Sequence, residues 1–60
     1  MKDIRNAVLF TSRIGENLVE FNSNGRRIKR RITSQEVVVL SELLKNKDYM
    51  QIDSFCFKIV

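Results

Sequence analysis

Hydrophobic and polar residues alternate over much of the first half of the chain, and one short motif marks a reversal of direction. The motif is Asn24-Gly25, which lies between two alternating segments. Both central residues of a type I′ hairpin turn have a positive φ, and asparagine and glycine tolerate that conformation best. The pattern therefore predicts a β-hairpin centred on residues 24 and 25.

A two-residue turn at this place determines which residues lie opposite each other. It pairs two apolar side chains, Phe21 and Ile28, and two opposite charges, Glu20 and Lys29. Each such cross-strand pair stabilises a hairpin by roughly 0.2–1 kcal/mol. The remaining predicted pairs are Ser23 with Arg26, Asn22 with Arg27, Val19 with Arg30, and Leu18 with Arg31.

A second turn near Gly15-Glu16 adds a third antiparallel strand before the hairpin. In this arrangement Val8 and Phe10 share an apolar face with the hairpin residues Val19, Phe21, Ile28 and Ile32. We expect the opposite face to be a basic solvent face interrupted by two leucines. Its members are Leu9, Thr11, Arg13, Leu18, Glu20, Asn22, Arg27, Lys29 and Arg31.

The residues Thr33-Ser34-Gln35-Glu36 predict the start of a helix. They have the form of a capping box, with Thr33 at the N-cap and Glu36 reaching back from the third helical position. The helix is expected to run from Ser34 to about Asn46, with Val38 facing away from the core. Its apolar side is formed by Val37, Leu40, Leu43 and Leu44.

The apolar residues change phase near the end of the chain, which predicts a bulge or turn at Asp53-Ser54. Met50 and Ile52 are in one phase, whereas Phe55, Phe57 and Ile59 are in the other. We expect the last residues to form a strand that pairs within a sheet or against another subunit. The predicted fold is one α+β domain over residues 1–60: a three-stranded antiparallel sheet, one helix and a C-terminal strand, in the order β-β-β-α-β.

The small size of the chain limits its core. A 60-residue domain buries only roughly 60% of the surface that its unfolded chain exposes, so self-association as a homodimer is expected to supplement the core. Cys56 is the only cysteine and histidine is absent, so we expect no internal disulfide, no zinc site and no other cofactor. A lone thiol and the lack of a long apolar run predict a cytoplasmic protein without a membrane partner.

The net charge of +4 comes from one segment. Five of the eleven basic residues lie between Arg26 and Arg31, and the rest of the chain has six basic against seven acidic residues. Alternation directs Arg27, Lys29 and Arg31 to one face of the strand, about 6.5–7 Å apart. Arg26 and Arg30 fall on the other side.

The composition argues against an enzyme. Without histidine the chain lacks the commonest proton carrier and the usual partner of a catalytic serine or cysteine. Cys56 lies between two phenylalanines, so we interpret it as a buried packing residue. The acidic residues have no metal-binding or paired-carboxylate spacing, and both glycines are explained by turns.

The basic face predicts a nucleic-acid-binding regulator, with DNA favoured over RNA. A two- or three-stranded ribbon can enter the major groove, where arginine or lysine donates to guanine and asparagine pairs with adenine. The expected contacts are Arg13, Arg27, Lys29 and Arg31, with Asn22 as a base reader and with Arg26 and Arg30 on phosphates. Stacking on unpaired bases is disfavoured because Phe10 and Phe21 are expected in the core.

Two resemblances point to the same class of function. The architecture looks like the three-stranded-sheet-plus-helix domains of plant ethylene-response factors and of integrase arm-binding modules, which implies DNA contact through the sheet face away from the helix. The stretch Thr11-Ser-Arg-Ile-Gly-Glu-Asn-Leu18 is similar to the opening hairpin of the carbon storage regulator family of RNA-binding dimers. That family usually has two adjacent arginines there, of which Arg13 matches the second and Ser12 replaces the first.

Two alternatives remain open. A charged strand face can simply be solvated, with Glu20 neutralising Lys29. The chain can also be a protein-interaction module or an inhibitor of a partner protein, of the kind that mobile elements use as accessory proteins. That function would use a helix face at Val38 or an exposed strand edge that presents Phe55, Phe57 and Ile59.

Overall fold

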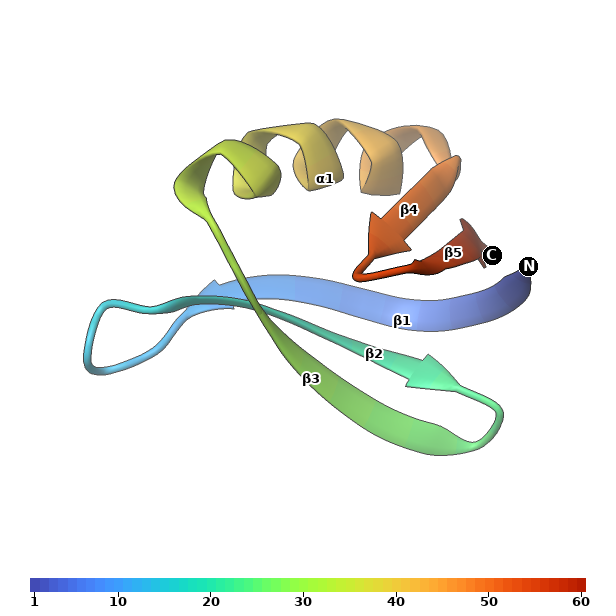
Figure 1. Cartoon of the computed structure of the whole chain (residues 1–60), viewed down its shortest axis with the longest axis horizontal. Helices are drawn as coiled ribbons and strands as arrows, with labels where there is room; N and C mark the ends of the chain where they lie inside the picture. The colour runs from blue at the N-terminus through green and yellow to red at the C-terminus, as the bar shows by residue number, and fades with distance from the viewer.

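Five strands and one helix follow one another in a computed structural model, which describes residues 1–60. The elements are β1 (Lys2–Thr11), β2 (Asn17–Ser23), β3 (Arg26–Ile32), α1 (Ser34–Asn46), β4 (Tyr49–Ile52) and β5 (Phe55–Ile59). The strands form one sheet in the order β3-β2-β1-β5-β4 (Figure 1). The pairs are antiparallel except β1 with β5, which is parallel. The α+β class is confirmed, but the sheet is mixed and has five strands.

The central hairpin has the predicted turn and register. Asn24 and Gly25 have φ values of 52° and 78°, the positive values that a type I′ turn requires. All six predicted pairs between β2 and β3 are present, and a seventh joins Asn17 to Ile32. The local turn chemistry is therefore sufficient to determine this register.

The predicted face of β1 is wrong because the strand contains a β-bulge. Arg5 pairs with Asn22 and Val8 pairs with Glu20, so β1 advances by three residues where β2 advances by two. Asn6, inside the bulge, has a φ of 54°. The additional residue reverses the alternation, so Leu9 lies opposite the core residue Val19.

Val8 and Phe10 therefore lie on the solvent face of the sheet, not on the apolar face as predicted. Val8 is exposed and Phe10 is half-buried. Leu9, predicted on the basic face, packs against the core, and so does Ala7. Thr11 also lies on the inner face, because it is two residues after Leu9 on the same strand.

The helix has the predicted bounds and the predicted cap. The Thr33 hydroxyl accepts a hydrogen bond of 3.2 Å from the Glu36 amide, and the Glu36 carboxylate accepts one of 3.0 Å from the Thr33 amide. Lys47, in the left-handed conformation, ends the helix, and its amide donates to the carbonyl of Leu44. Val38 is exposed as expected. With 13 residues, α1 is too short to span a bilayer, which takes about 20.

The end of the chain forms a hairpin and not a single strand. Asp53, with a φ of 56°, lies in the turn between β4 and β5. The predicted turn is confirmed, and it explains the change of phase: after the turn, residues of the opposite parity face the core. Four residues of the two strands are buried: Met50, Ile52, Phe57 and Ile59.

Two predictions about this segment need correction. The expected pairing of the last strand within a sheet is confirmed, but the exposed strand edge of the alternative function is wrong, because β5 is an interior strand between β1 and β4. Residues 57–59 pair with β1, and residues 55–58 pair with β4. Phe57 and Ile59 are buried in the core, and only Phe55 is exposed. Cys56, predicted to be buried, is also exposed, because it alternates with the buried Phe57.

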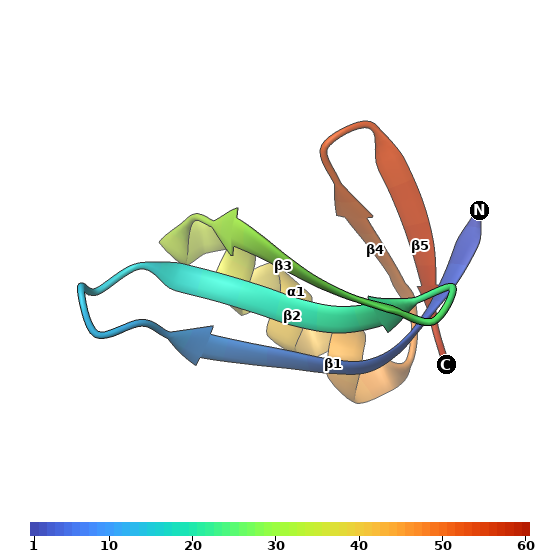
Figure 2. The same ribbon diagram turned by 90° about the horizontal axis from the view of Figure 1, so that it is seen from below.

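The core lies between the inner face of the sheet and α1. Nine side chains form it, including the Phe21 and Phe57 rings, whose centroids are 5.3 Å apart. The sheet is strongly bent, so the β4–β5 hairpin runs across the direction of β1 to β3, and α1 lies behind them (Figure 2). The opposite face of β1 to β3, which we call the outer face, is not covered by any element.

Candidate nucleic-acid interface

Three rows of side chains cross the outer face from β1 through β2 to β3. The strand register defines them, because paired residues project to the same side of a sheet. The rows are Arg5–Asn22–Arg27, Val8–Glu20–Lys29 and Phe10–Leu18–Arg31. This face points away from α1 (Figure 1). The structure thus brings together Arg27, Lys29, Arg31 and Asn22 as predicted, and it adds Arg5.

Arg27 is the most constrained cation of the outer face. Its Nε donates to Glu20 at 2.7 Å, and its Nη1 donates to the Asn6 carbonyl at 3.0 Å and to Asn22 Oδ1 at 3.3 Å. The bulge turns the Asn6 carbonyl toward the guanidinium, so the same irregularity that reverses β1 also holds Arg27. Its position is therefore determined before any ligand arrives.

Glu20 is the acidic group beside these cations. The hydrogen bond from Arg27 lowers the pKa of Glu20 below its ordinary value, partial desolvation opposes this, and the charges of Arg27 and Lys29 add to the lowering. Glu20 is therefore ionised at neutral pH. It reduces the positive potential in the middle of the outer face.

Lys29 has an aromatic partner and forms no salt bridge. Its ammonium lies 5.6 Å from the centroid of the Phe10 ring, within the range of a cation–π interaction. None of the three salt bridges in the molecule includes Lys29. The sequence does not predict this contact, because strict alternation places Phe10 in the core.

Arg31 and Arg13 lie at the other end of the outer face. The Nε of Arg31 is 2.6 Å from a carboxylate oxygen of Glu16, although the Arg31 side chain is 77% exposed. Arg13, predicted on a strand opposite Leu18, lies in the exposed turn between β1 and β2, and Phe10 takes the place opposite Leu18. The difference arises because β1 ends at Thr11, before Arg13 is reached.

Arg26 and Arg30 point to the inner side of β3, as their alternation predicts. Arg30 Nη1 lies 3.5 Å from Asp53 Oδ2 in the β4–β5 turn, so this arginine bridges the edge of β3 to the second hairpin. Arg26 is exposed next to the Asn24-Gly25 turn. Both are at the margin of the sheet and not on its outer face.

A polar cleft of about 460 Å³ lies at the end of the outer face that is nearest the central turn. Its lining has no hydrophobic residue and consists of Asp3, Arg5, Asn6, Asn22, Asn24 and Gly25. Asn22 Oδ1 accepts from Arg27, and the amides of Asn6 and Asn24 make no side-chain hydrogen bond within the molecule. The cleft therefore presents amide donors and acceptors beside one guanidinium, of Arg5, and one carboxylate, of Asp3.

Arg5 is not among the predicted contacts, although the alternation that predicts Leu9 and Thr11 on the basic face places Arg5 on that face as well. The alternation gives no sign of the bulge, because Ile4, Val8 and Phe10 have the same parity. In the structure Ile4 and Leu9 are both inner residues, at an odd separation that strict alternation cannot accommodate. A bulge between them resolves the conflict, and Asn6 is a residue type that tolerates its positive φ. With the bulge assumed, Arg5, Val8 and Phe10 would all be assigned to the outer face.

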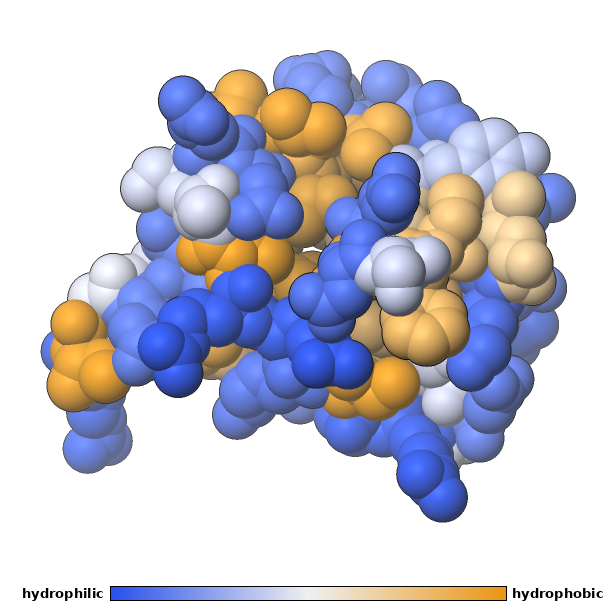
Figure 3. All heavy atoms as spheres, in the orientation of Figure 1, coloured by the Kyte–Doolittle hydropathy of each residue, from blue (hydrophilic) through white to orange (hydrophobic).

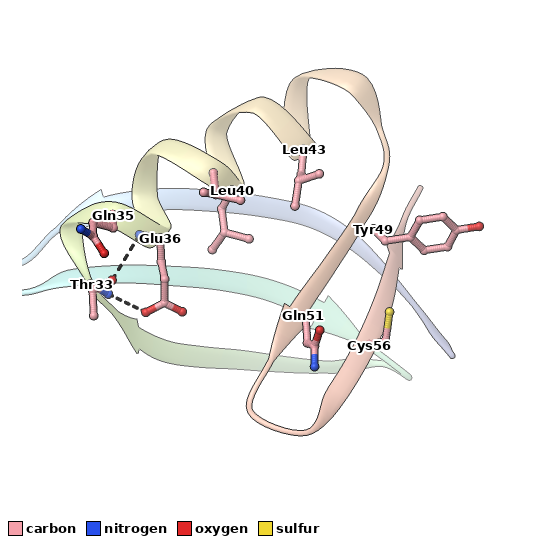
Figure 4. A pocket seen from close by; sticks show the side chains of 9 residues that line it. Thr33, Gln35, Glu36, Leu40, Leu43, Tyr49, Gln51 and Cys56 are labelled. Atoms are coloured by element: carbon pink, nitrogen blue, oxygen red, sulfur yellow. Dashed lines mark hydrogen bonds between the residues drawn. The ribbon is translucent and has the colours of Figure 1, made fainter.

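A second concave surface lies between α1 and the β4–β5 hairpin. This groove of about 510 Å³ is lined by Thr33, Gln35, Glu36, Val39, Leu40, Leu43, Tyr49, Gln51 and Cys56. Figure 4 shows Leu40 and Leu43 projecting from α1 toward the strands, with Gln51 and Cys56 on the hairpin opposite. Apolar surface is exposed along α1 and in the hollow beneath it (Figure 3). No three His, Cys, Asp or Glu side chains are grouped so that they could hold a metal ion.

Comparison of the chain with family models, with curated proteins and with solved structures gives no match.

Proposed function

We propose that this protein is a small non-enzymatic regulator that binds nucleic acid through the outer face of β1, β2 and β3. One observation carries the proposal: four cations, Arg5, Arg27, Lys29 and Arg31, gather on one sheet face that no other element covers. Phosphate contacts from arginine and lysine supply most of the affinity of such surfaces.

The acidic residues next to these cations reduce the positive charge of the outer face but do not remove it. Glu20 and Glu16 hold Arg27 and Arg31 by their Nε atoms. Arg27 Nη1 is also engaged, with Asn6 and Asn22, so Nη2 of Arg27 and both terminal nitrogens of Arg31 are available to phosphate oxygens. Lys29 and Arg5 have no carboxylate partner within salt-bridge distance. Arg13 in the neighbouring turn extends the positive surface, and Arg26 and Arg30 lie at its margin.

The test is the salt dependence of binding to labelled mixed-sequence duplex DNA and to a structured RNA, measured by fluorescence anisotropy. If about three to five phosphates are neutralised, log affinity for a duplex should fall with log salt at a slope of roughly −3 to −4.5. Changing Arg27, Lys29 and Arg31 together to alanine should abolish most of the binding and flatten the slope.

A control variant removes the same amount of charge away from the outer face: Lys2→Gln, Lys45→Gln and Lys47→Asn. Asparagine is chosen at position 47 because the residue there has a φ of 53°. The control should keep the parent affinity within about twofold. Equal losses in the two variants, or no binding by the parent at low salt, would contradict the proposal.

A second candidate function is protein binding, and the groove between α1 and β4 favours it. Val39 and Tyr49 are exposed at 57% and 46%, and Val38 is exposed at 67% on the same helix. A strand edge at Phe55, Phe57 and Ile59 is no longer a basis for this function, because β5 is paired on both sides. A stoichiometric partner that is captured from nuclease-treated extract and lost in Val39→Glu would favour this candidate.

The proposed function leads us to expect a particular cellular location and assembly state of the protein. We expect a cytoplasmic protein, where nucleic-acid targets are accessible. An unpaired C-terminal strand is not a reason to expect a homodimer, because β5 is interior. The small core of nine buried apolar side chains still favours self-association. Sedimentation at high micromolar concentration tests it, and a monomer there would contradict it.

A further inference from the structure

The Phe10 ring changes the kind of nucleic acid that suits the outer face. Phe10 is half-buried on the outer face, with Leu18 beside it across the strand pair and Lys29 above its ring. β1 pairs with β5 only through residues 2–4, so no strand lies beside Phe10 on its other side. The ring is thus accessible from the solvent side, within a group of cations.

We propose that the outer face binds single-stranded nucleic acid, with one unpaired base stacked on the Phe10 ring and the adjacent phosphates held by Lys29, Arg31 and Arg13. The inference rests on the proposed function and adds the class of ligand to it. Base stacking on aromatic side chains within a basic groove is the general means by which proteins hold single strands. A duplex cannot use it, because its bases are already stacked on each other.

The cation–π interaction shows that one face of the Phe10 ring is contacted by the end of a flexible side chain and not by the packed core. The Lys29 ammonium lies over the ring and has no carboxylate within salt-bridge distance. A nucleobase that stacks on the ring displaces this ammonium, which can then move to a phosphate oxygen. In the complex, a charge-assisted hydrogen bond from Lys29 to phosphate thus takes the place of its cation–π interaction with Phe10.

The polar cleft supplies a second contact point on the same face. Asn22 in the cleft and Leu18 beside Phe10 are four residues apart on β2, which corresponds to about 13 Å at 3.3–3.4 Å per residue. Amide groups such as those of Asn22 and Asn24 can donate to and accept from the edge of an unpaired base. A single strand that runs along β2 can therefore stack one base at Phe10 and present the edge of another to the cleft.

The experiment compares a labelled mixed-sequence single strand, as DNA and as RNA, with the blunt duplex of the same sequence at one low salt concentration. The proposal expects at least one of the single strands to bind several-fold more tightly than the duplex. Phe10→Leu retains apolar volume and removes the ring, so it should weaken single-strand binding by roughly 5- to 100-fold, as loss of one stacking ring does elsewhere. Duplex binding should change by less than about twofold.

Phe55→Leu is the matched control. Phe55 also lies under a lysine, with the Lys2 ammonium 5.5 Å from its ring centroid. Unlike Phe10, it is on the inner side of the second hairpin, away from the outer face. It should bind single strands like the parent. Circular dichroism of both variants checks that they remain folded.

If the Arg27, Lys29 and Arg31 variant loses binding while Phe10→Leu keeps it, or if the duplex binds as tightly as both single strands, this inference is wrong and the proposed function stands. If the parent binds no nucleic acid at low salt, both fail.

Discussion

The orientation of the Arg27 side chain depends on three groups from different parts of the sheet. Its guanidinium is held by the carboxylate of Glu20, by the carbonyl of Asn6 in the β1 bulge and by the amide oxygen of Asn22. All of these contacts are at least partly exposed to water, so each contributes little to the free energy of unfolding. Their main effect is to orient the guanidinium within the outer face.

The Glu20–Arg27 pair has a testable pH dependence. Because the pKa of Glu20 is lowered in the folded protein, the pair contributes to stability above the pKa of Glu20 in the unfolded chain. This contribution disappears as the pH falls through the lower pKa of the folded state. Carboxyl carbon chemical shifts should show Glu20 titrating at a lower pH in the parent than in Arg27→Ala.

Two variants, Arg27→Ala and Glu20→Gln, test whether this pH dependence comes from the Glu20–Arg27 pair. Glu20→Gln should remove the acid dependence that the pair contributes and should strengthen binding to nucleic acid at neutral pH, because one negative charge leaves the outer face. A Glu20 titration that does not change when Arg27 is removed would refute the assignment.

At the scale of single elements, the capping box shows how completely a local motif can determine a boundary. The reciprocal hydrogen bonds of Thr33 and Glu36 satisfy two backbone amides at the start of α1 (Figure 4). Three consecutive valines follow, and they are poor helix formers, so the helix needs its cap and the burial of Leu40.

Thr33→Ala should therefore lower the free energy of unfolding by about 1 kcal/mol, because it leaves the Glu36 amide without its partner. Urea unfolding followed by circular dichroism measures the change. Ser41→Ala is the control in the middle of the same helix, where the Ser41 hydroxyl donates to the Val37 carbonyl at 2.7 Å. It should be neutral or slightly stabilising, since alanine is the better helix former. A loss in Ser41→Ala as large as that in Thr33→Ala would show that the cap has no special role.

At the scale of the whole molecule, β5 joins the two ends of the chain. It lies between β1 and β4, and its parallel pairing with β1 brings the first and last strands together. Phe57 on β5 packs against the Phe21 ring and so connects the second hairpin to the central one. This strand is therefore central to the stability of the molecule.

Phe57→Ala should destabilise the protein by about 3–5 kcal/mol, the usual cost of removing a buried phenylalanine. A 60-residue domain with roughly 0.05–0.15 kcal/mol of stability per residue has about 3–9 kcal/mol in total, so this change removes about a third of it or more. Chemical denaturation should show a much lower midpoint for the variant than for the parent. Phe55→Ala, at a position that is 52% exposed, should cost much less. Similar losses in the two variants would contradict the placement of β5.

The sequence-based predictions are correct where neighbouring residues alone decide the structure. They include the Asn24-Gly25 turn, the register of β2 with β3, the cap and bounds of α1, and the turn at Asp53-Ser54. The basic row of Arg27, Lys29 and Arg31 follows from the same register. In each case the determining contacts lie within one turn of chain or one hairpin.

The sequence by itself thus determined the hairpin, the helix and the row of cations, because these depend on backbone preferences and on periodicity. Only the tertiary structure decided where the bulge in β1 lies, that β5 is an interior strand, and that Phe10 faces solvent beside Lys29. These features depend on contacts between segments that are distant in the chain. A single inserted residue reverses every later side chain of a strand, and the choice is made by which side chains the complete core can bury.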